Sequence, residues 1–238
     1  MKLRIDKVLS NMGIGSRKQI KQYAKQGYIK INDEVVKDSS KIIDTDVDQI
    51  KYKGETIKYF QYIYLMMNKP MGVVSATEDN YDKTVIDLLS DEDKIFNPFP
   101  VGRLDKDTEG FLLITNDGQL AHDLLSPKKH VDKTYYAEVE EEVTENDVKA
   151  FAEGVVLTNE NYKTLPAKLQ IIQSGYPSTC YVTIKEGKFH QVKRMFNAVN
   201  NEVIYLKRLS MGPLKLDEGL KLGEYRHLTD EEVQLLKK

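Results

Sequence analysis

The chain has 238 residues, 40% hydrophobic and 30% charged, which is enough to build one large domain or a medium and a small one. It contains no apolar run of about 18 residues, and the segment MKLRIDKVLS has no apolar core, so we expect neither a membrane span nor a signal peptide. A single cysteine excludes an internal disulfide, and the four scattered histidines show no metal-ligand spacing. We therefore expect a cytoplasmic protein without a bound metal.

Charge is distributed unevenly along the chain, although the net charge is only −2. Residues 1–60 carry 13 Lys and Arg against 8 Asp and Glu, whereas residues 61–238 carry 22 against 29. A basic head followed by an acidic body predicts two domains with these bounds, the first of which binds a polyanion. The alternative is a solvated helix face, which is the commoner fate of a charge run.

The beginning of the chain predicts two short helices and a hairpin. Apolar residues recur at helical spacing over 5–12, and Ser16 is placed to cap a second helix that ends at Gly27. Residues 28–31 and 35–36 then read as two short strands joined by a turn. The second helix carries basic residues on its outer side: Arg17, Lys18, Lys21 and Lys25.

The body contains more predicted strands than helices. The expected strands cover residues 62–67, 111–115, 134–139, 169–172 and 181–184. The expected helices are a short one at 85–89, one at 119–125, one capped by Thr144, one over 190–199, and a last one with the capping box Thr229 and Glu232. Because the strands come partly in runs, we predict an α+β fold with a mixed, largely antiparallel sheet flanked by helices.

Residues 100–118, PVGRLDKDTEGFLLITNDG, form the most informative segment of the chain. Arg103 and Asp105 lie in a glycine-bounded loop that runs directly into the apolar strand predicted at 111–115. Catalytic side chains are commonly found on loops that a rigid scaffold positions. The plain alternative is a surface turn, since aspartates such as Asp105 and Asp107 often cap turns.

Two further segments carry candidate polar groups. The sequence KTYY at 133–136 lies in a predicted strand, where alternation puts Tyr135 and Tyr136 on opposite faces, so that only one can face a cleft. The sequence EGKFHQVKRMF at 186–196 predicts an amphipathic helix. Its polar stripe consists of His190, Lys193, Arg194 and Asn197. The plain alternatives are a packed tyrosine and a solvated helix face.

Taken in this order, the motifs closely resemble those of the pseudouridine synthases of the RsuA type. The closing segment VIYLKR, residues 203–208, resembles the last motif of that family. Residues 1–60 resemble the S4 RNA-binding domain, a small αL-like module. The matching positions there are Arg4, Asp6, Leu9, Gly13, Ser16, Arg17, Gly27, Ile29, Ile31 and Asn32, whereas Thr45–Asp46 departs from the usual Gly-Asp.

The resemblance implies roles for individual residues. Asp105 matches the essential catalytic carboxylate, Tyr135 the active-site tyrosine, and Lys193 the cation beside the carboxylate, with the adjacent Arg194 as an alternative. Arg103 matches the arginine that fills the place of the flipped uridine, and Leu206 the leucine beside the base. The residues we expect to bind RNA are Arg4, Arg17, Lys18, Lys21, Lys25, Arg103, Arg194 and Arg208.

The implied activity is the conversion of a ribosomal RNA uridine into pseudouridine, which conserves atoms and requires no cofactor. The variant FHQVKRMF favours 16S RNA and a site of the uridine 516 type, with ribosomal RNA as the partner of a monomeric enzyme. Alternatives are a synthase for 23S RNA and a non-catalytic S4-domain RNA-binding or ribosome-assembly factor. A more distant one is a glycosidase-like enzyme that uses Asp105 with Glu109. The sequence leaves open the target uridine, whether the substrate is free RNA or a partly assembled ribosomal particle, and whether the attack is on ribose or uracil.

Overall fold

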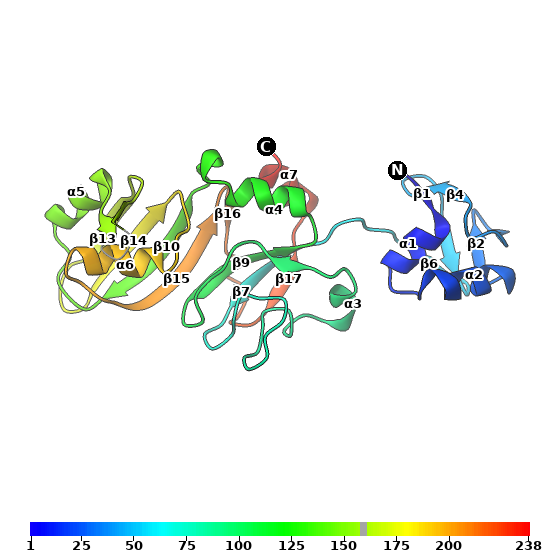
Figure 1. Ribbon diagram of the computed structural model, residues 1–238, viewed down its shortest axis with the longest axis horizontal. Helices are drawn as coiled ribbons and strands as arrows, with labels where there is room; N and C mark the ends of the chain where they lie inside the picture. Colours follow the sequence, from blue (N-terminus) through cyan, green and yellow to red (C-terminus); the bar gives the residue numbers. More distant parts are fainter. Residues whose placement is uncertain (158–160) are drawn as a thin grey trace. The chain divides into compact units, whose positions relative to one another are not determined.

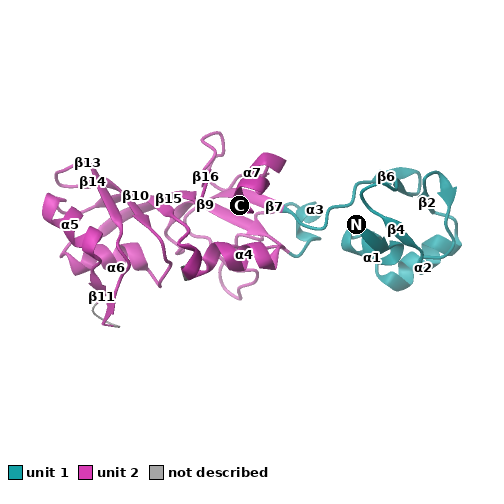
Figure 2. Ribbon diagram, turned by 90° about the horizontal axis from the view of Figure 1, so that it is seen from above, with its two compact units in different colours: residues 1–63, 90–97 teal, residues 64–89, 98–238 magenta. Residues whose placement is uncertain are grey.

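The computed structural model describes residues 1–157 and 161–238, and the chain divides into two compact units (Figure 2). The first unit contains residues 1–63 and 90–97, and the second contains 64–89 and 98–238. Residues 90–97, part of the predicted domain 61–238, are thus grouped with the first unit. Within the described residues, no helix is both long and apolar enough to cross a bilayer.

The first unit has three helices, two of which contribute buried residues to its core together with small sheets. Apolar spacing over residues 5–12 correctly predicts α1, whose Ile5, Val8 and Leu9 are fully buried. Ser16 caps α2 as expected, since its side chain accepts a hydrogen bond from the backbone N–H of Gln19. The helices of this unit are α1 (Ile5–Asn11), α2 (Arg17–Lys25) and α3 (Asp91–Lys94).

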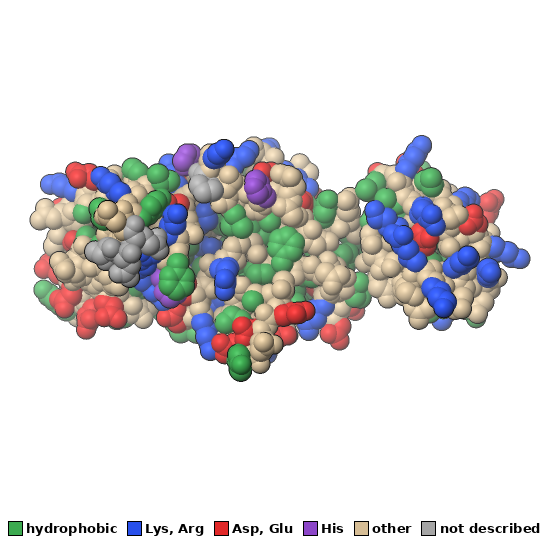
Figure 3. Space-filling view, in the orientation of Figure 1, with side chains coloured by type: hydrophobic (Ala, Val, Ile, Leu, Met, Phe, Trp, Pro, Cys, Tyr) green, Lys and Arg blue, Asp and Glu red, His purple; other side chains and the backbone are tan. Residues whose placement is uncertain are grey.

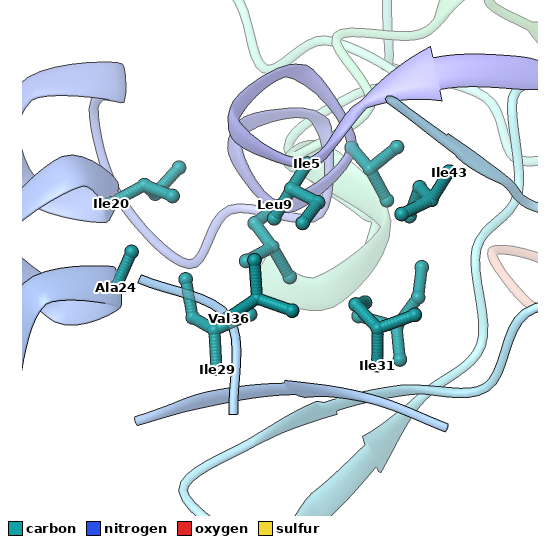
Figure 4. Packing of buried hydrophobic residues seen from close by; sticks show 10 residues of the cluster. Ile5, Leu9, Ile20, Ala24, Ile29, Ile31, Val36 and Ile43 are labelled. Atoms are coloured by element: carbon teal, nitrogen blue, oxygen red, sulfur yellow. The ribbon is translucent and has the colours of Figure 1, made fainter. Parts of the chain in front are cut away.

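The strands of the first unit contribute buried side chains to the same core as its helices. Figure 4 shows Ile29 and Val36 between the helix residue Ala24 and Ile31, and all of them belong to one core cluster with Leu9. The four-stranded sheet has the order β3-β2-β5-β6, and β1 pairs separately with β4. Their bounds are β1 (Lys2–Arg4), β2 (Ile29–Ile31), β3 (Glu34–Val35), β4 (Ile42–Asp44), β5 (Ile50–Tyr52) and β6 (Glu55–Ile57).

The second unit is organised around one long sheet with the order β13-β14-β10-β15-β9-β7-β17 (Figure 1). Two further strands lie off this path, since β16 pairs with β15 and β8 pairs with β9. The named strands of the sheet pair antiparallel except β15 with β9, which confirms the mixed, largely antiparallel sheet. The bounds are β7 (Tyr64–Lys69), β8 (Phe99–Pro100), β9 (Glu109–Thr115), β10 (Lys133–Val139), β13 (Lys168–Gln173), β14 (Ser178–Ile184), β15 (Val203–Met211), β16 (Leu214–Lys215) and β17 (Tyr225–His227). Separately, β11 (Val156–Leu157) pairs antiparallel with β12 (Tyr162–Lys163).

The parallel contact between β9 and β15 depends on Gly110. A Cβ atom at this position would lie 2.2 Å from the carbonyl oxygen of Arg208, and the residue has a φ of +102°. Only glycine allows this approach. The strand that follows the Asp105 loop therefore lies directly beside the strand that carries Leu206 and Arg208.

Helices pack on the sheet at its β9–β7 end and at its β13 end. Buried side chains of α4 and α7 pack with Met66 and Phe111 of the central strands. At the other end α5 lies against β13, and Phe151 of α5 contacts Phe196 of α6 with ring centroids 5.0 Å apart. The helices are α4 (Gly118–Leu125), α5 (Glu145–Glu153), α6 (Gln191–Ala198) and α7 (Asp230–Leu236), with a 3-10 turn, η1 (Pro127–Lys129).

Every predicted helix and strand except one has a counterpart in the structure, with bounds that differ by up to three residues, as for the strand predicted at 62–67, which is β7 (Tyr64–Lys69). The capping box of the last helix is present, since Thr229 accepts from the backbone N–H of Glu232. The short helix predicted at 85–89 is wrong, because this segment forms consecutive turns. There the Asp87 carboxylate accepts a hydrogen bond of 2.7 Å from the Thr84 amide, and such local side-chain bonds compete with helix formation.

Candidate active site

The candidate active site is a pocket in the second unit, formed by one face of the sheet and two loops. Lys133 and Tyr135 of β10 line it together with Leu206 and Arg208 of β15. The strand register places Tyr135 opposite Arg208 and Ala137 opposite Leu206, which brings these side chains to the same face. The loop 102–108 and the segment 187–193 complete the walls.

The two adjacent tyrosines separate as strand alternation predicts. Tyr135 lines the pocket and is 7% exposed. Tyr136 points to the other face, where its ring lies 6.2 Å from that of Tyr181 and 6.0 Å from that of Tyr205. Of the pair, only Tyr135 can contact a molecule bound in the pocket.

Asp105 lies at the wall of the pocket between two basic side chains. Lys193 Nζ is 3.5 Å from Asp105 Oδ2, and His190 Nε2 is 3.5 Å from Asp105 Oδ1. Arg194 instead donates a hydrogen bond of 3.2 Å to the carbonyl of Phe189. The structure therefore brings together Asp105, Tyr135 and Lys193 in one pocket, and places Lys193 rather than Arg194 beside the carboxylate.

Lys193 is shared between two carboxylates of the same loop. Its shortest contact is a hydrogen bond of 2.6 Å to Asp107 Oδ1, whose side chain is 70% exposed. Partial burial acts to raise the pKa of Asp107, but the hydrogen bond and the charge of Lys193 outweigh it and hold the pKa below its ordinary value. Asp107 thus holds the Lys193 ammonium group at the edge of the pocket.

Lys69, which was not among the predicted site residues, supports the Asp105 loop by hydrogen bonds to its backbone. It has no exposed surface, and its Nζ donates hydrogen bonds to the carbonyls of Asp105 at 3.0 Å and Thr108 at 2.9 Å. It also reaches the carbonyls of Pro70 and Lys106. Burial lowers the pKa of Lys69 to about 8, while the negative charges of Asp107, Asp105 and Glu109 act to raise it.

The position of Lys69 in the sequence carries a signal of its burial. Lys69 follows the apolar run 62–67 and directly precedes Pro70, a residue that commonly ends a strand. The strand β7 continues through Lys69, so the charge is carried into the core. A lysine at the end of a buried strand is rarely tolerated unless its ammonium group is hydrogen-bonded.

Two further cations lie buried at the floor of the pocket. Arg208 is 2% exposed and its Nε donates a hydrogen bond of 2.8 Å to the carbonyl of Phe111. Lys133 is 6% exposed and donates to the carbonyl of Val131. Burial, together with the charge of Arg208, lowers the pKa of Lys133 to about 8. Arg208, expected to bind RNA, can therefore do so only from within the pocket.

The remaining predicted pocket residues differ in exposure. Arg103 lines the pocket with an exposed side chain and makes no ion pair in the described part of the chain. Leu206 is a buried part of the wall. Glu109 lies outside the wall and accepts a hydrogen bond of 2.6 Å from Tyr205, so the second carboxylate of the glycosidase alternative is not in the pocket.

The expected RNA-binding residues of the first unit lie mostly on one helix. Arg17, Lys18, Lys21 and Lys25 are all exposed on α2. Figure 3 shows Lys and Arg side chains spread over the visible face of this unit. Arg4 is engaged differently, because its Nε and Nη2 donate to the buried carboxylate of Asp6 at 3.1 and 2.7 Å.

Comparison with known proteins identifies the family. Residues 63–198 match the RNA pseudouridylate synthase family. The chain belongs to this family. It is therefore an isomerase that converts uridine in RNA into pseudouridine, and not a non-catalytic binding factor. Residues 3–48 match the S4 domain, which confirms the predicted S4 domain at the beginning of the chain.

Relatives of this synthase match it over nearly the whole chain. An uncharacterized RNA pseudouridine synthase of Bacillus subtilis is 53% identical, with 98% of each chain covered. The ribosomal small subunit pseudouridine synthase A of Vibrio cholerae is 41% identical, covering 97% of this chain and 98% of its own. A crystal structure of a pseudouridylate synthase aligns with a TM-score of 0.69 and 39% identity over 98% of this chain and 99% of the other. The predicted resemblance to the RsuA type is confirmed.

The described residues contain no group of three or more His, Cys, Asp or Glu side chains that could hold a metal ion. The side chains that line the pocket are instead one carboxylate, several cations, an aromatic ring and aliphatic groups. Such a set can position a base and a ribose and supply one nucleophile or base.

Proposed function

We propose that this synthase isomerises one uridine of small-subunit ribosomal RNA, at a site of the uridine 516 type, with Asp105 as its catalytic residue. The observation that carries the proposal is the Asp105 carboxylate between Lys193 and His190, in a pocket that Tyr135 also lines. Support for the RNA class comes from relatives named ribosomal small subunit pseudouridine synthase A. The enzyme acts on this RNA as a cytoplasmic monomer.

The reaction breaks the N1–C1′ bond of the uridine, turns the uracil over, and joins C5 to C1′. The target base must first leave its stack, at a cost of a few kcal/mol. In the pocket, the Tyr135 ring and the Leu206 side chain form walls against which a uracil can pack. Asp105 then acts as nucleophile or base, and the nearby Lys193 ammonium balances its charge.

Arg103 is the group that fills the place of the flipped base. It is exposed on the loop that carries Asp105, two residues away. Its planar guanidinium can stack on neighbouring bases and bind phosphate at the same time. The loop would therefore insert one side chain into the RNA while it presents the other to the extruded nucleotide.

The target is tested by mapping pseudouridines in ribosomal RNA from cells with and without the protein. We expect one pseudouridine of 16S RNA to disappear in its absence and to return with the wild-type protein. A site lost from 23S RNA would establish the alternative substrate, and an unchanged map would contradict the proposal. Reaction of the purified protein with free 16S RNA and with small ribosomal subunits then identifies the physical substrate.

Tyr135→Phe is expected to retain more activity than Tyr135→Ala. Phenylalanine keeps the ring that packs on the uracil, whereas alanine removes it and leaves a space in the pocket wall. We expect kcat/KM to fall about tenfold or more further in the alanine variant, since base–aromatic stacking contributes roughly 1–3 kcal/mol. Single-turnover pseudouridine formation measures both variants. Equal losses would show that the hydroxyl carries the role of this residue.

Neutralising Lys18, Lys21 and Lys25 together as glutamines is expected to weaken RNA binding and reduce its salt dependence. Removing one phosphate contact reduces the slope of log K against log salt by about 0.7 to 0.9, so removing three changes it by about 2 to 3. Titrations between low and moderate salt measure the slope. The matched control replaces three exposed lysines of the second unit, Lys149, Lys163 and Lys168, and should leave it unchanged.

A further inference from the structure

We propose that a chamber beside the catalytic pocket binds the nucleotide adjoining the target uridine, and that the base of this nucleotide stacks on Phe189. The inference rests on the proposed function, because it assumes that an RNA uridine enters the pocket. It goes further in assigning a separate subsite, an exposed aromatic ring and an unpaired nucleobase as its occupant.

The chamber is continuous with the catalytic pocket. The two share Arg103, Asp105 and His190 in their walls, so that a nucleotide in one directly adjoins a nucleotide in the other. The chamber extends outward along Phe189 and Tyr162. A polynucleotide that places a uridine beside Asp105 must pass a flanking nucleotide through the adjoining space.

Phe189 presents one face of its ring to solvent and the other to His190. Its side chain is 72% exposed, and the two rings are stacked with centroids 3.7 Å apart and planes inclined by 19°. The inner ring, His190, lies 3.5 Å from the Asp105 carboxylate. A base added to the free face of Phe189 would therefore continue an existing stack that begins at the catalytic carboxylate.

The loop that carries Phe189 is held in place before RNA binds. The buried carboxylate of Glu186 accepts hydrogen bonds from Tyr162 at 2.6 Å and from Gln191 at 2.8 Å. Gln191 in turn accepts from the backbone N–H of Lys188 at 2.8 Å. Arg194 donates to the Phe189 carbonyl at 3.2 Å. A loop fixed in this way loses little conformational freedom when a base stacks on the ring that it carries.

The backbone at His190 also indicates a functional placement. This residue has φ of 48° and ψ of 36°, a left-handed conformation that is uncommon for a residue other than glycine. It directly precedes α6 and places the imidazole between Asp105 and Phe189. Residues held in sparsely populated conformations cluster at active sites and ligand clamps.

The charges around the chamber favour a nucleotide over an apolar protein side chain. Lys188 Nζ lies 4.5 Å from the centroid of the Tyr162 ring, and Arg103 is exposed on the opposite loop. Lys133 forms a further cationic part of the wall. An aromatic face next to several cations suits a base and its phosphate, which is the usual arrangement of a single-strand binding groove.

The test uses an RNA fragment that carries whichever uridine the mapping assigns to this enzyme, together with two fragments that lack the base on its 5′ or its 3′ side. Phe189→Ala in the full chain is expected to raise KM about tenfold on the intact RNA while kcat changes less than twofold. Phe189→Tyr should restore KM, because it restores the ring. The matched control is Tyr176→Ala, which removes a ring that is 73% exposed on the turn between β13 and β14 and should have no effect.

The decisive comparison is between intact and base-deleted RNA. On one of the two base-deleted fragments, wild-type and Phe189→Ala enzymes should show the same KM, because the partner of the ring is gone. Three results would overturn the proposal. Phe189→Ala could raise KM on both base-deleted fragments, leave KM on intact RNA unchanged, or lower kcat alone. Failure of the proposed function is recognised separately, since the mapping would then show no pseudouridine of small-subunit RNA that depends on the enzyme.

Discussion

Asp105→Asn is expected to form no detectable pseudouridine while binding RNA within about tenfold of the wild-type protein. The amide keeps the shape of the side chain but removes both its negative charge and its basicity, and the loss of a nucleophile or base costs about 10⁴-fold or more in kcat. Binding should survive because the basic residues of α2 and the pocket cations remain. Tritium release from RNA labelled at uracil C5 measures turnover, and filter binding measures affinity.

Asp107→Asn is the matched control for this experiment. Asp107 lies two residues away in the same loop and makes the shorter contact to Lys193, at 2.6 Å against 3.5 Å for Asp105. It is nevertheless exposed and does not line the pocket. We expect its turnover to stay within about tenfold of wild type, a range typical of loosened positioning rather than of a missing catalytic group. Normal turnover by Asp105→Asn, or a larger loss in Asp107→Asn, would reassign the catalytic carboxylate.

The parts of this site that depend on local periodicity could be predicted from the sequence. Strand alternation separates Tyr135 from Tyr136, and helical spacing places Lys193 on the polar side of α6. Both patterns are fixed by backbone geometry, whatever the rest of the fold does. The loop of Asp105 is identified less directly, by its glycines and by the apolar strand that follows it.

The parts that depend on tertiary contacts could not be predicted. Lys69 is 36 residues from Asp105 in sequence, and only the pairing of β7 with β9 brings its ammonium group under that loop. Arg208 reads as a basic residue for RNA, yet the β9–β15 contact buries it and turns its Nε to the Phe111 carbonyl. At 85–89 the apolar pattern suits a helix, but hydrogen bonds between Asp87 and Thr84 favour turns.

The charged groups around Asp105 form more than one ion pair. Lys193 lies between Asp105 and Asp107, and His190 approaches Asp105 from the other oxygen. Lys69 meanwhile reaches the backbone carbonyl of Asp105 rather than its carboxylate. The carboxylate therefore keeps its contacts to the two side chains at the rim, while its backbone is fixed from the core. Position and charge are thus controlled by separate groups.

Lys69→Met is expected to lower turnover by about 100-fold or more and to destabilise the protein by about 3 kcal/mol at pH 7. Methionine fills a similar volume but leaves the carbonyls of Asp105 and Thr108 without their donor, and each unsatisfied buried group costs roughly 1–3 kcal/mol. Displacement of a catalytic group by about 1 Å can reduce the rate about 100-fold. Urea unfolding and single-turnover kinetics measure the two effects. An exposed lysine, Lys128, replaced by Met is the control and should change neither.

The pH dependence of this variant tests whether the lysine is buried as a cation. The pKa of Lys69 is about 8 in the folded protein against 10.5 for the ordinary side chain, so Lys69 loses its proton at a lower pH in the folded protein than in the unfolded chain. Between these two values the unfolded chain binds more protons, so the stability of the wild-type protein must rise with pH relative to Lys69→Met. The difference of about 2.5 between the two pKa values corresponds to a gain of about 3 kcal/mol in the free energy of unfolding across that window. A difference between the two proteins that stays constant from pH 7 to 10 would mean that the four carbonyls hold the ammonium group charged throughout, and that the loop is anchored by a permanent cation.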